Sequence, residues 1–409
     1  MSANAPQIYG ADEVNAVVLD VGTSTTQYGF AGLDQPSCVI SSAYGEISGD
    51  GRRVFDDNVL YSSKRDDLVI KPIVKNNMVQ DWDAAADQWQ YLTNILNVDP
   101  SEQPLLQTES TMNSFENKKK AMEVAFEKLG HCAYFSVKQP ACVSFAHGRP
   151  NCLVVDVGDE LVTVTPVIDG FCLKNHVMGT KYAGKFLDQE LIQMLEVRGF
   201  NSEKTWKEKY PKSTEWEGLQ SFQGVTSEPR KSEVDQSVLN FAMKRTLREM
   251  KESVVECCLE DELNTNESDL LNPSQEALND EDTRFFELPN GASIPFTLRE
   301  RQLLGNSLFN PSNTVLGNGS IVKGWEEPYT GDIRSRLVKT GDITSKEYVP
   351  LRRSKKTDED DGSKSTEPSE SNGQPLGLTD LVNSVLNHLD VDVKPQLANN
   401  IILTGSTSL

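Results

Sequence analysis

An apolar run that ends in Asp-Val-Gly occurs twice in this chain, and this repeat constrains the fold more than any other feature of the sequence. Ala16 to Gly22 reads Ala-Val-Val-Leu-Asp-Val-Gly, and Cys152 to Asp159 reads Cys-Leu-Val-Val-Asp-Val-Gly-Asp. Each copy has the composition of a buried strand that leads into a tight turn, where Gly adopts a positive φ most easily. The repeat predicts an internally duplicated chain.

Turns of this kind suit phosphate binding. Successive backbone N–H groups point into one concavity, and the Asp of each turn can hold Mg²⁺ through water. A single Asp-x-Gly turn more often only reverses the chain, but its repetition in a matched apolar context favours a site. Asp20 and Asp156 are the first candidates for this site. We expect the two turns to face each other and to hold a polyphosphate between two domains.

Composition excludes several classes of protein. The seven cysteines are odd in number and lack a Cys-x-x-Cys pair, so they predict reduced core residues of a cytosolic or nuclear protein. The four scattered histidines form no zinc motif. No apolar run is long enough to span a bilayer and no signal peptide is visible, so we expect a soluble protein without a membrane partner.

The net charge of −21 disfavours direct binding to DNA or RNA, because phosphate backbones are bound by fields of Lys and Arg. An acidic surface favours basic partners such as histones. The same charge also serves solubility alone, and both interpretations stay open.

Strand and helix signals alternate along the chain and predict an α/β protein. The spacing of Trp82 and Trp89, with Asp81 as N-cap, indicates an amphipathic helix. The segment Tyr44 to Asp57 indicates an exposed loop or a small edge sheet. Further helices are expected over 114–129, 182–195, 234–259 and 376–389, further strands over 104–108, 161–167 and 400–404, and a turn over 288–291.

Short motifs in a fixed order resemble the actin family over nearly the whole chain. They run from Leu-Asp-Val-Gly-Thr and Gly-Phe-Ala-Gly through Val-Val-Asp-Val-Gly-Asp, Glu-Leu-Pro-Asn-Gly and Leu-Phe-Asn-Pro to a closing Leu-Thr-Gly-Ser-Thr. Cys142-Val143-Ser144-Phe145 and Ala183-Gly184-Lys185-Phe186 are similar to the nuclear actin-related proteins of fungi in particular.

The resemblance implies the α/β fold that actin shares with hexokinase and Hsp70, with two duplicated domains around a cleft for ATP and Mg²⁺ or Ca²⁺. It implies a first domain over 1–150, with a small subdomain at about 40–80, and a second over 151–313 that resumes at 376–409. Residues 314–375 are charged and predict a largely disordered insertion. A buried strand entering a Gly/Ser/Thr loop needs a covering helix, so we expect further chain after residue 409.

The resemblance also assigns roles to matching residues. It implies that the phosphates and the cation are bound by Asp20, Gly22, Thr23, Asp156, Gly158 and Asp159. It implies that Lys251, Glu252 and Gly405 contact adenosine and that Gln139 orients the attacking water. Taken alone, Lys251 and Glu252 suit a solvated helix face and Gln139 a buried hydrogen-bonding residue, but the ordered motif set favours the binding roles.

Four positions depart from the family pattern. Actins have a phosphate-binding Lys, a His near the water, a Gly in the second turn and a second Gly in the adenosine loop, whereas this chain has Gln27, Thr163, Glu160 and Ser406. A lost cation and an added carboxylate each cost about 1 to 4 kcal/mol within about 4 Å of the triphosphate. We therefore expect slow or absent hydrolysis.

The resemblance implies an ATP-binding, non-catalytic subunit of nuclear chromatin-remodelling and histone-acetyltransferase complexes, acting in transcription regulation and DNA repair. In that role it pairs with actin along a helix of a scaffold protein and contacts histones or the nucleosome. Two alternatives stay open: an enzyme, either an actin-like ATPase or a phosphotransferase, and a cytoskeletal subunit that polymerises. The short, polar segment Tyr44 to Asp57 disfavours the polymer, because a filament contact must bury a strand edge or an apolar plug.

Overall fold

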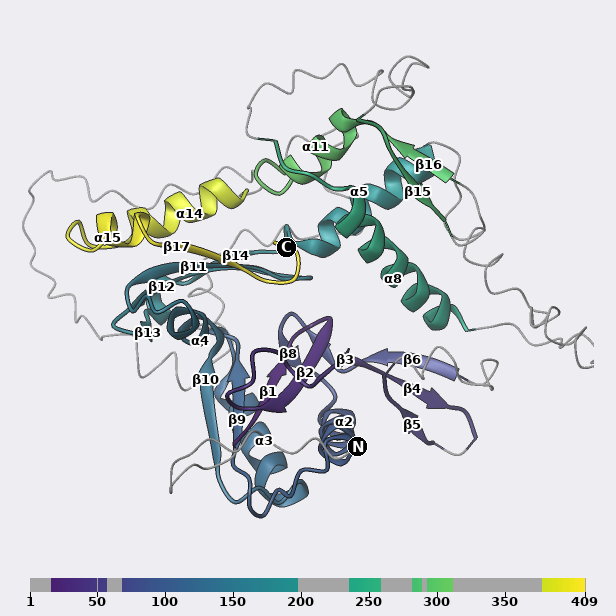
Figure 1. The fold of residues 1–409 in the computed structure, drawn as a ribbon, viewed down its shortest axis with the longest axis vertical. Helices are drawn as coiled ribbons and strands as arrows, with labels where there is room; N and C mark the ends of the chain where they lie inside the picture. The colour runs from purple at the N-terminus through teal and green to yellow at the C-terminus, as the bar shows by residue number, and fades with distance from the viewer. Residues whose placement is uncertain are drawn as a thin grey trace, which may run out of the picture.

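The computed structural model of this chain describes residues 16–49, 51–56, 68–197, 235–258, 282–288, 293–311 and 377–408. Two mixed sheets, each built around one copy of the Asp-Val-Gly repeat, form its centre (Figure 1). Residues 289–291 of the expected turn at 288–291 and the expected insertion at 314–375 fall outside the described residues.

The first sheet surrounds the first copy of the repeat. Its order is β10-β9-β1-β2-β3, and β1 runs antiparallel to β2 and parallel to β9. The burial of β1 alternates along the strand, so one face points into the core. The strands are β1 (Val17–Val21), β2 (Thr25–Phe30), β3 (Cys38–Ser41), β9 (Leu105–Glu109) and β10 (Tyr134–Lys138).

The second sheet repeats this arrangement. Its order is β13-β12-β11-β17, with β14 also paired to β12, and β11 runs antiparallel to β12 and parallel to β17. β11 and β17 therefore correspond to β1 and β9, which is the duplication that the repeat predicts. The strands are β11 (Cys152–Val157), β12 (Val162–Ile168), β13 (Phe171–Cys172), β14 (Met178–Thr180) and β17 (Ile401–Thr404).

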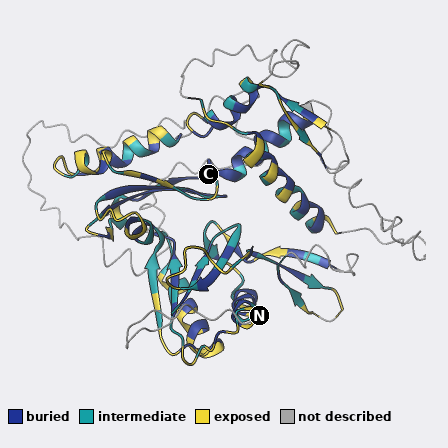
Figure 2. Ribbon diagram, in the orientation of Figure 1, coloured by how far each residue is buried: buried dark blue, intermediate teal, exposed yellow. Residues whose placement is uncertain are grey.

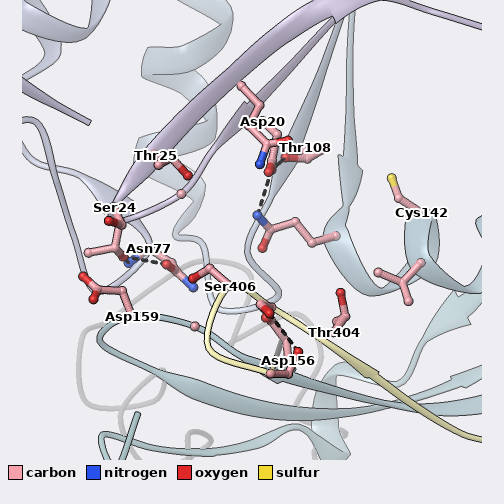
Figure 3. A pocket seen from close by; sticks show the side chains of 18 of the residues that line it. Asp20, Ser24, Thr25, Asn77, Thr108, Cys142, Asp156, Asp159, Thr404 and Ser406 are labelled. Atoms are coloured by element: carbon pink, nitrogen blue, oxygen red, sulfur yellow. Dashed lines mark hydrogen bonds between the residues drawn. The ribbon is translucent and has the colours of Figure 1, made fainter. Parts of the chain in front are cut away.

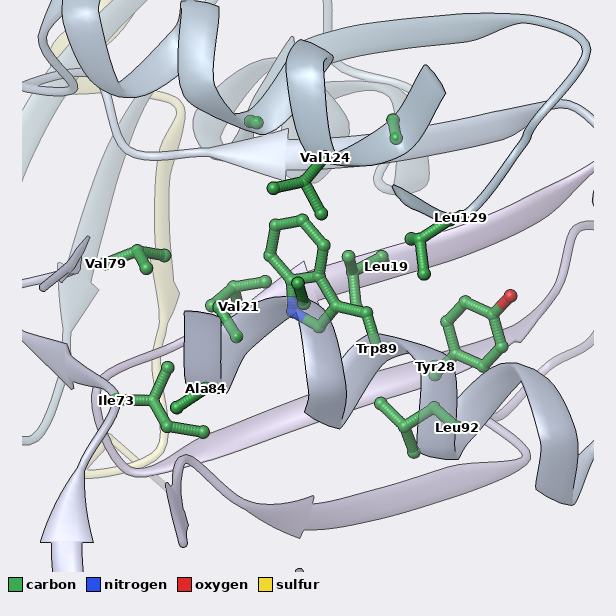
Figure 4. Packing of buried hydrophobic residues seen from close by; sticks show 14 of the residues in the cluster. Leu19, Val21, Tyr28, Ile73, Val79, Ala84, Trp89, Leu92, Val124 and Leu129 are labelled. Carbon is green, nitrogen blue, oxygen red and sulfur yellow. The ribbon is translucent and has the colours of Figure 1, made fainter. Parts of the chain in front are cut away.

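A helix with a fully buried Trp anchors the core beside the first sheet. Asp81 caps this helix by accepting a hydrogen bond from the backbone N–H of Ala84 at 2.9 Å, as predicted. Trp89 is 1% exposed and lies among Leu19, Val124 and other apolar side chains (Figure 4). We call the part of the chain before β11 the first half and the part from β11 onward the second half. The helical elements of the first half are α2 (Trp82–Ile95), α3 (Phe115–Glu123), the π-helical turn η2 (Val124–Lys128) and α4 (Gln139–Ala146).

Helices of the second half form two separate cores. α14, α15 and the first turns of α5 pack on the second sheet, whereas the rest of α5, α8 and α11 pack with a two-stranded hairpin (Figures 1 and 2). The elements are η3 (Lys174–His176), α5 (Gly184–Val197), α8 (Gln236–Val254), β15 (Arg284–Glu287), β16 (Ser293–Phe296), α11 (Leu298–Asn306), α14 (Leu378–Asn387) and α15 (Lys394–Ala398).

A small sheet from the first half reaches a helix of the second half. β5 (Arg53–Val54), β4 (Ala43–Ile47) and β6 (Leu68–Pro72) form it in that order, so the polar segment at 44–57 builds a small sheet over its described residues. The side chains of Leu68 and Ile70 pack on Val238 of α8, and the Ile70 N–H donates to the Ser237 hydroxyl at 2.8 Å. A short hairpin, β7 (Val74–Lys75) with β8 (Met78–Val79), follows this sheet.

All seven cysteines lie in the described residues and are free thiols. Cys132 and Cys257 are exposed, so the predicted core placement is wrong for these two. Among the described helices, none combines the length and apolar character needed to cross a membrane.

Candidate functional site

A cavity of about 720 Å³ lies between the two sheets and is lined by both Asp-Val-Gly turns. Its lining brings together most of the residues that the family resemblance singles out. They are Asp20, Gly22, Thr23, Gln139, Asp156, Gly158, Asp159 and Gly405. Figure 3 shows Asp20 and Asp156 approaching the cavity from opposite sheets.

The two turns have the same backbone geometry. The Gly22 N–H donates to the Thr25 carbonyl at 3.0 Å, and the Gly158 N–H donates to the Leu161 carbonyl at 3.0 Å. A Cβ would lie 3.0 Å from the carbonyl oxygen at Gly22 and 2.9 Å from it at Gly158. Neither glycine has a positive φ, so the prediction that glycine is needed here for a positive φ is wrong. Glycine is needed because a side chain would come too close to the carbonyl oxygen three residues later in the turn.

Asp20 is held in place by residues from two other elements of the first half. Its Oδ1 accepts a hydrogen bond from Gln139 Nε2 at 2.9 Å and another from the Thr108 hydroxyl. Thr108 stands in β9, which is parallel to β1, and Gln139 begins α4, directly after β10. The parallel pairing brings the carboxyl ends of these strands to one edge of the sheet, which fixes the direction of the Asp20 carboxylate.

Asp156 is half-buried opposite Asp20. Burial, with the charge of Asp20 as a second cause, raises the pKa of Asp156 to about 6. A carboxylate pair in which the charge of Asp20 disfavours that of Asp156 fits a divalent cation, which prefers oxygen ligands. No group of three or more His, Cys, Asp or Glu side chains is assembled within the described ranges, so a cation here would keep water or phosphate oxygens among its ligands.

The loop after β17 closes a third side of the cavity. Gly405 has a φ of 103°, and a Cβ there would overlap the Val157 carbonyl and the Asp156 carboxylate. Thr407 fastens the loop to the second turn, since its N–H donates to Val157 O at 3.0 Å and its hydroxyl donates to Gly158 O at 2.9 Å. Gly405 is therefore the residue that lets the loop approach the Asp156 carboxylate.

Asp159 lines the cavity but is paired with α8. Burial alone would raise its pKa, but Lys244 Nζ, 2.5 Å from the carboxylate, and the more distant charges of Lys251 and Arg248 hold the pKa of Asp159 below its ordinary value. The carboxylate is therefore ionised at neutral pH and already neutralised by the protein.

The structure does not bring Lys251 and Glu252 into the cavity lining. Lys251 forms an ion pair with Asp188 at 2.7 Å and donates to the Gly184 carbonyl at 2.9 Å, while Glu252 is exposed on α8. Their proposed contact with adenosine stays a prediction, and Lys251 has a defined structural role in joining α8 to α5.

The departures from the family pattern do not all act at the cavity. Gln27 and Ser406 line it, whereas Thr163 is buried on β12 opposite Asp156 and outside the lining. Glu160 is also outside the lining. Its carboxylate accepts from the Asn76 N–H at 2.8 Å and lies 3.0 Å from Lys185 Nζ. The expectation that Glu160 adds charge beside the triphosphate is therefore corrected.

Sequence reasoning missed two residues that shape the cavity, Asn77 and Thr108. Asn77 exchanges hydrogen bonds with Thr23: the Thr23 hydroxyl donates to Asn77 Oδ1 at 2.6 Å, and the Asn77 N–H donates to Thr23 Oγ1 at 2.9 Å. The Asn-Asn pair at 76–77 was a visible turn signal, and Thr108 lay at the end of a predicted strand.

The actin sequence model matches residues 11–409 of the chain. A protein of Candida albicans named actin-related protein 4 is 35% identical, over 100% of this chain and 84% of its own length. Proteins of the same name from Saccharomyces cerevisiae and Schizosaccharomyces pombe are 32% and 30% identical, over 100% and 98% of this chain and 85% and 82% of their own lengths.

Proposed function

The chain belongs to the actin family and is an actin-related protein, and on this premise we propose that its cleft binds ATP with Mg²⁺ or Ca²⁺ and hydrolyses it slowly or not at all. One observation carries the proposal. Two turns of matched geometry face a single cavity, and each turn contributes a buried or half-buried carboxylate to it.

The residues in the cavity fit such a ligand. Backbone N–H groups of the two turns, other than those of Gly22 and Gly158, and the hydroxyls of Ser24 and Thr25 are donors for phosphate oxygens. Asp20 and Asp156 would hold the cation through water, and Gly405, which lines the same cavity, would contact the nucleoside. When bound, the cation would supply the positive charge that this pair of carboxylates requires, and the phosphates of ATP would be held by both turns.

The lining supports slow turnover. Phosphoryl transfer is catalysed mainly by positive charge and donors aimed at the transferring group, together with a residue that orients water. Gln139 is available to orient water, but its amide also bonds to Asp20. Gln27 places a neutral amide in the cavity, and Thr163 lies outside it. The described lining contains neither a Lys nor an Arg, so it supplies no side-chain positive charge to the transferring phosphate.

We further propose that the protein acts as a structural subunit of nuclear chromatin-remodelling or histone-acetyltransferase complexes, with roles in transcription regulation and DNA repair. Its proposed partners are actin, a scaffold helix and histones. The relatives named actin-related protein 4 support the view that this chain is an actin-related protein. The net charge of −21 suits basic partners such as histones.

Purification of the tagged full chain from nuclear extract, followed by mass spectrometry, tests this role. We expect actin to be recovered together with subunits of a remodelling or acetyltransferase complex. Recovery of the chain alone, or as a polymer that sediments after addition of ATP and Mg²⁺, would contradict the proposed role and favour an independent ATPase or cytoskeletal protein.

A further inference from the structure

Glu160 connects the two halves of the chain outside the cavity lining. It follows the second turn, yet its carboxylate accepts a hydrogen bond from the N–H of Asn76, in the β7–β8 hairpin of the first half, at 2.8 Å. Its other oxygen lies 3.0 Å from Nζ of Lys185 at the start of α5. The Glu160 side chain is 12% exposed, so this contact is largely shielded from water.

The hairpin that receives Glu160 is conformationally restricted. Val74 pairs with Val79 and Lys75 with Met78, which leaves a two-residue turn at Asn76 and Asn77. Both Asn residues have positive φ, 51° and 56°, as in a type I′ turn. A bond to the Asn76 N–H therefore fixes the whole turn.

The same turn forms a wall of the candidate nucleotide site. Asn77 lines the cavity (Figure 3). It exchanges two hydrogen bonds with Thr23 of the first turn. The contacts thus form a continuous path from Thr23 through Asn77 and Asn76 to Glu160 and Lys185. This path joins the first phosphate turn to the second without passing through any ligand.

We propose that Glu160 is a positioning residue that latches the two domains across the cleft and slows the release of a bound nucleotide. The carboxylate acceptor makes a charge-assisted hydrogen bond, which is stronger than a neutral one. The pair with Lys185 is weaker, because that side chain is 45% exposed, and it serves mainly to orient the carboxylate. The ligand in this inference rests on the proposed function, whereas the latch is a property of the chain alone.

Amide hydrogen exchange of the full chain, measured without nucleotide, tests the latch directly. In Glu160→Ala we expect the Asn76 amide to exchange at least about tenfold faster than in the wild type, because a charge-assisted bond is lost. Glu160→Gln keeps an acceptor oxygen without the charge and should restore part of the protection. Glu196→Ala, which removes an exposed carboxylate of α5, is the matched control and should leave Asn76 unchanged.

Release of a fluorescent ATP analogue, followed by stopped flow, gives the second reading. Glu160→Ala should release the analogue about tenfold faster than the wild type and the Glu196→Ala control. Lys185→Ala should accelerate Asn76 exchange by a smaller factor, and it tests the same path if Glu160→Ala does not fold.

Unchanged Asn76 exchange in Glu160→Ala, or in Lys185→Ala where only that variant folds, would overturn the latch. Faster Asn76 exchange with an unchanged release rate would overturn its effect on the nucleotide. If the wild type binds no analogue while Asn76 exchange still accelerates in the variant, the proposed function fails and the latch stands.

Discussion

Replacing Asp156 by Asn should stabilise the protein when cations and nucleotide are absent. Burial, and secondarily the charge of Asp20, raises the pKa of Asp156 from 3.8 to about 6. A shift of about 2 units corresponds to about 3 kcal/mol at 1.36 kcal/mol per unit. The half-buried Asn amide costs about 1 kcal/mol or more where it is unpaired, so we expect a net gain of up to about 2 kcal/mol at pH 7.

The pH dependence gives this prediction its sign. Between about pH 4 and pH 6 the folded protein holds the Asp156 proton more tightly than the unfolded chain does, so wild-type stability falls as pH rises through this range. The penalty is complete above about pH 6 and absent below about pH 4. The advantage of Asp156→Asn should therefore be largest at pH 7 and disappear at pH 4.

Urea unfolding in EDTA, followed by circular dichroism at pH 7 and pH 4, measures the effect. Asp392→Asn, at an exposed position of the second half, is the control and should change stability by less than about 0.5 kcal/mol. Addition of ATP and Mg²⁺ should raise the wild-type midpoint more than that of Asp156→Asn, because a ligand of the folded state stabilises it. A variant less stable than the wild type at pH 7 in EDTA would refute the reasoning.

Three further changes have defined outcomes. Gly405→Ala forces a methyl group against Val157 and Asp156 at a φ of 103°, so it should abolish nucleotide binding and cost about 1 to 3 kcal/mol; titration with a fluorescent nucleotide and thermal melts check this. Lys244→Ala leaves the buried Asp159 carboxylate without its partner and should cost about 1 to 2 kcal/mol at pH 7. The pKa of Asp159 is lowered in the wild type, so this loss should fade in urea titrations below about pH 4, and a loss independent of pH would exclude the ion pair as its cause. Trp89→Ala should lower the free energy of unfolding, measured in urea, by about 3 to 5 kcal/mol, and a loss below about 1 kcal/mol would show that the core beside the first sheet does not depend on this side chain.

The sequence predicts the centre of the fold well because local patterns determine it. The duplicated strand and turn reappear with the same pairing, β1 beside β9 and β11 beside β17. Helix starts also follow local rules: Asp81 and Ser114 cap their helices with side-chain hydrogen bonds to backbone N–H groups three residues later. In both cases the information lies within a few residues.

Contacts between distant residues were not predictable in this way. Glu160 was expected to face the triphosphate, but its partner Asn76 lies 84 positions away in the chain. Lys244 meets Asp159 across 85 positions, because α8 packs beside the second turn. The spacing of Lys244, Arg248 and Lys251 places them along one face of α8. The sequence does not indicate which of the two Asp-Val-Gly turns this face contacts.

Single-turnover measurement with ATP and Mg²⁺ on the purified full chain tests the central claim most directly. The claim is that the two turns hold a nucleotide without efficient hydrolysis. We predict that the chain retains stoichiometric ATP and that the bound nucleotide stays unhydrolysed far longer than it does in filamentous actin measured in parallel. Failure to retain ATP, or hydrolysis at the rate of filamentous actin, would contradict the account.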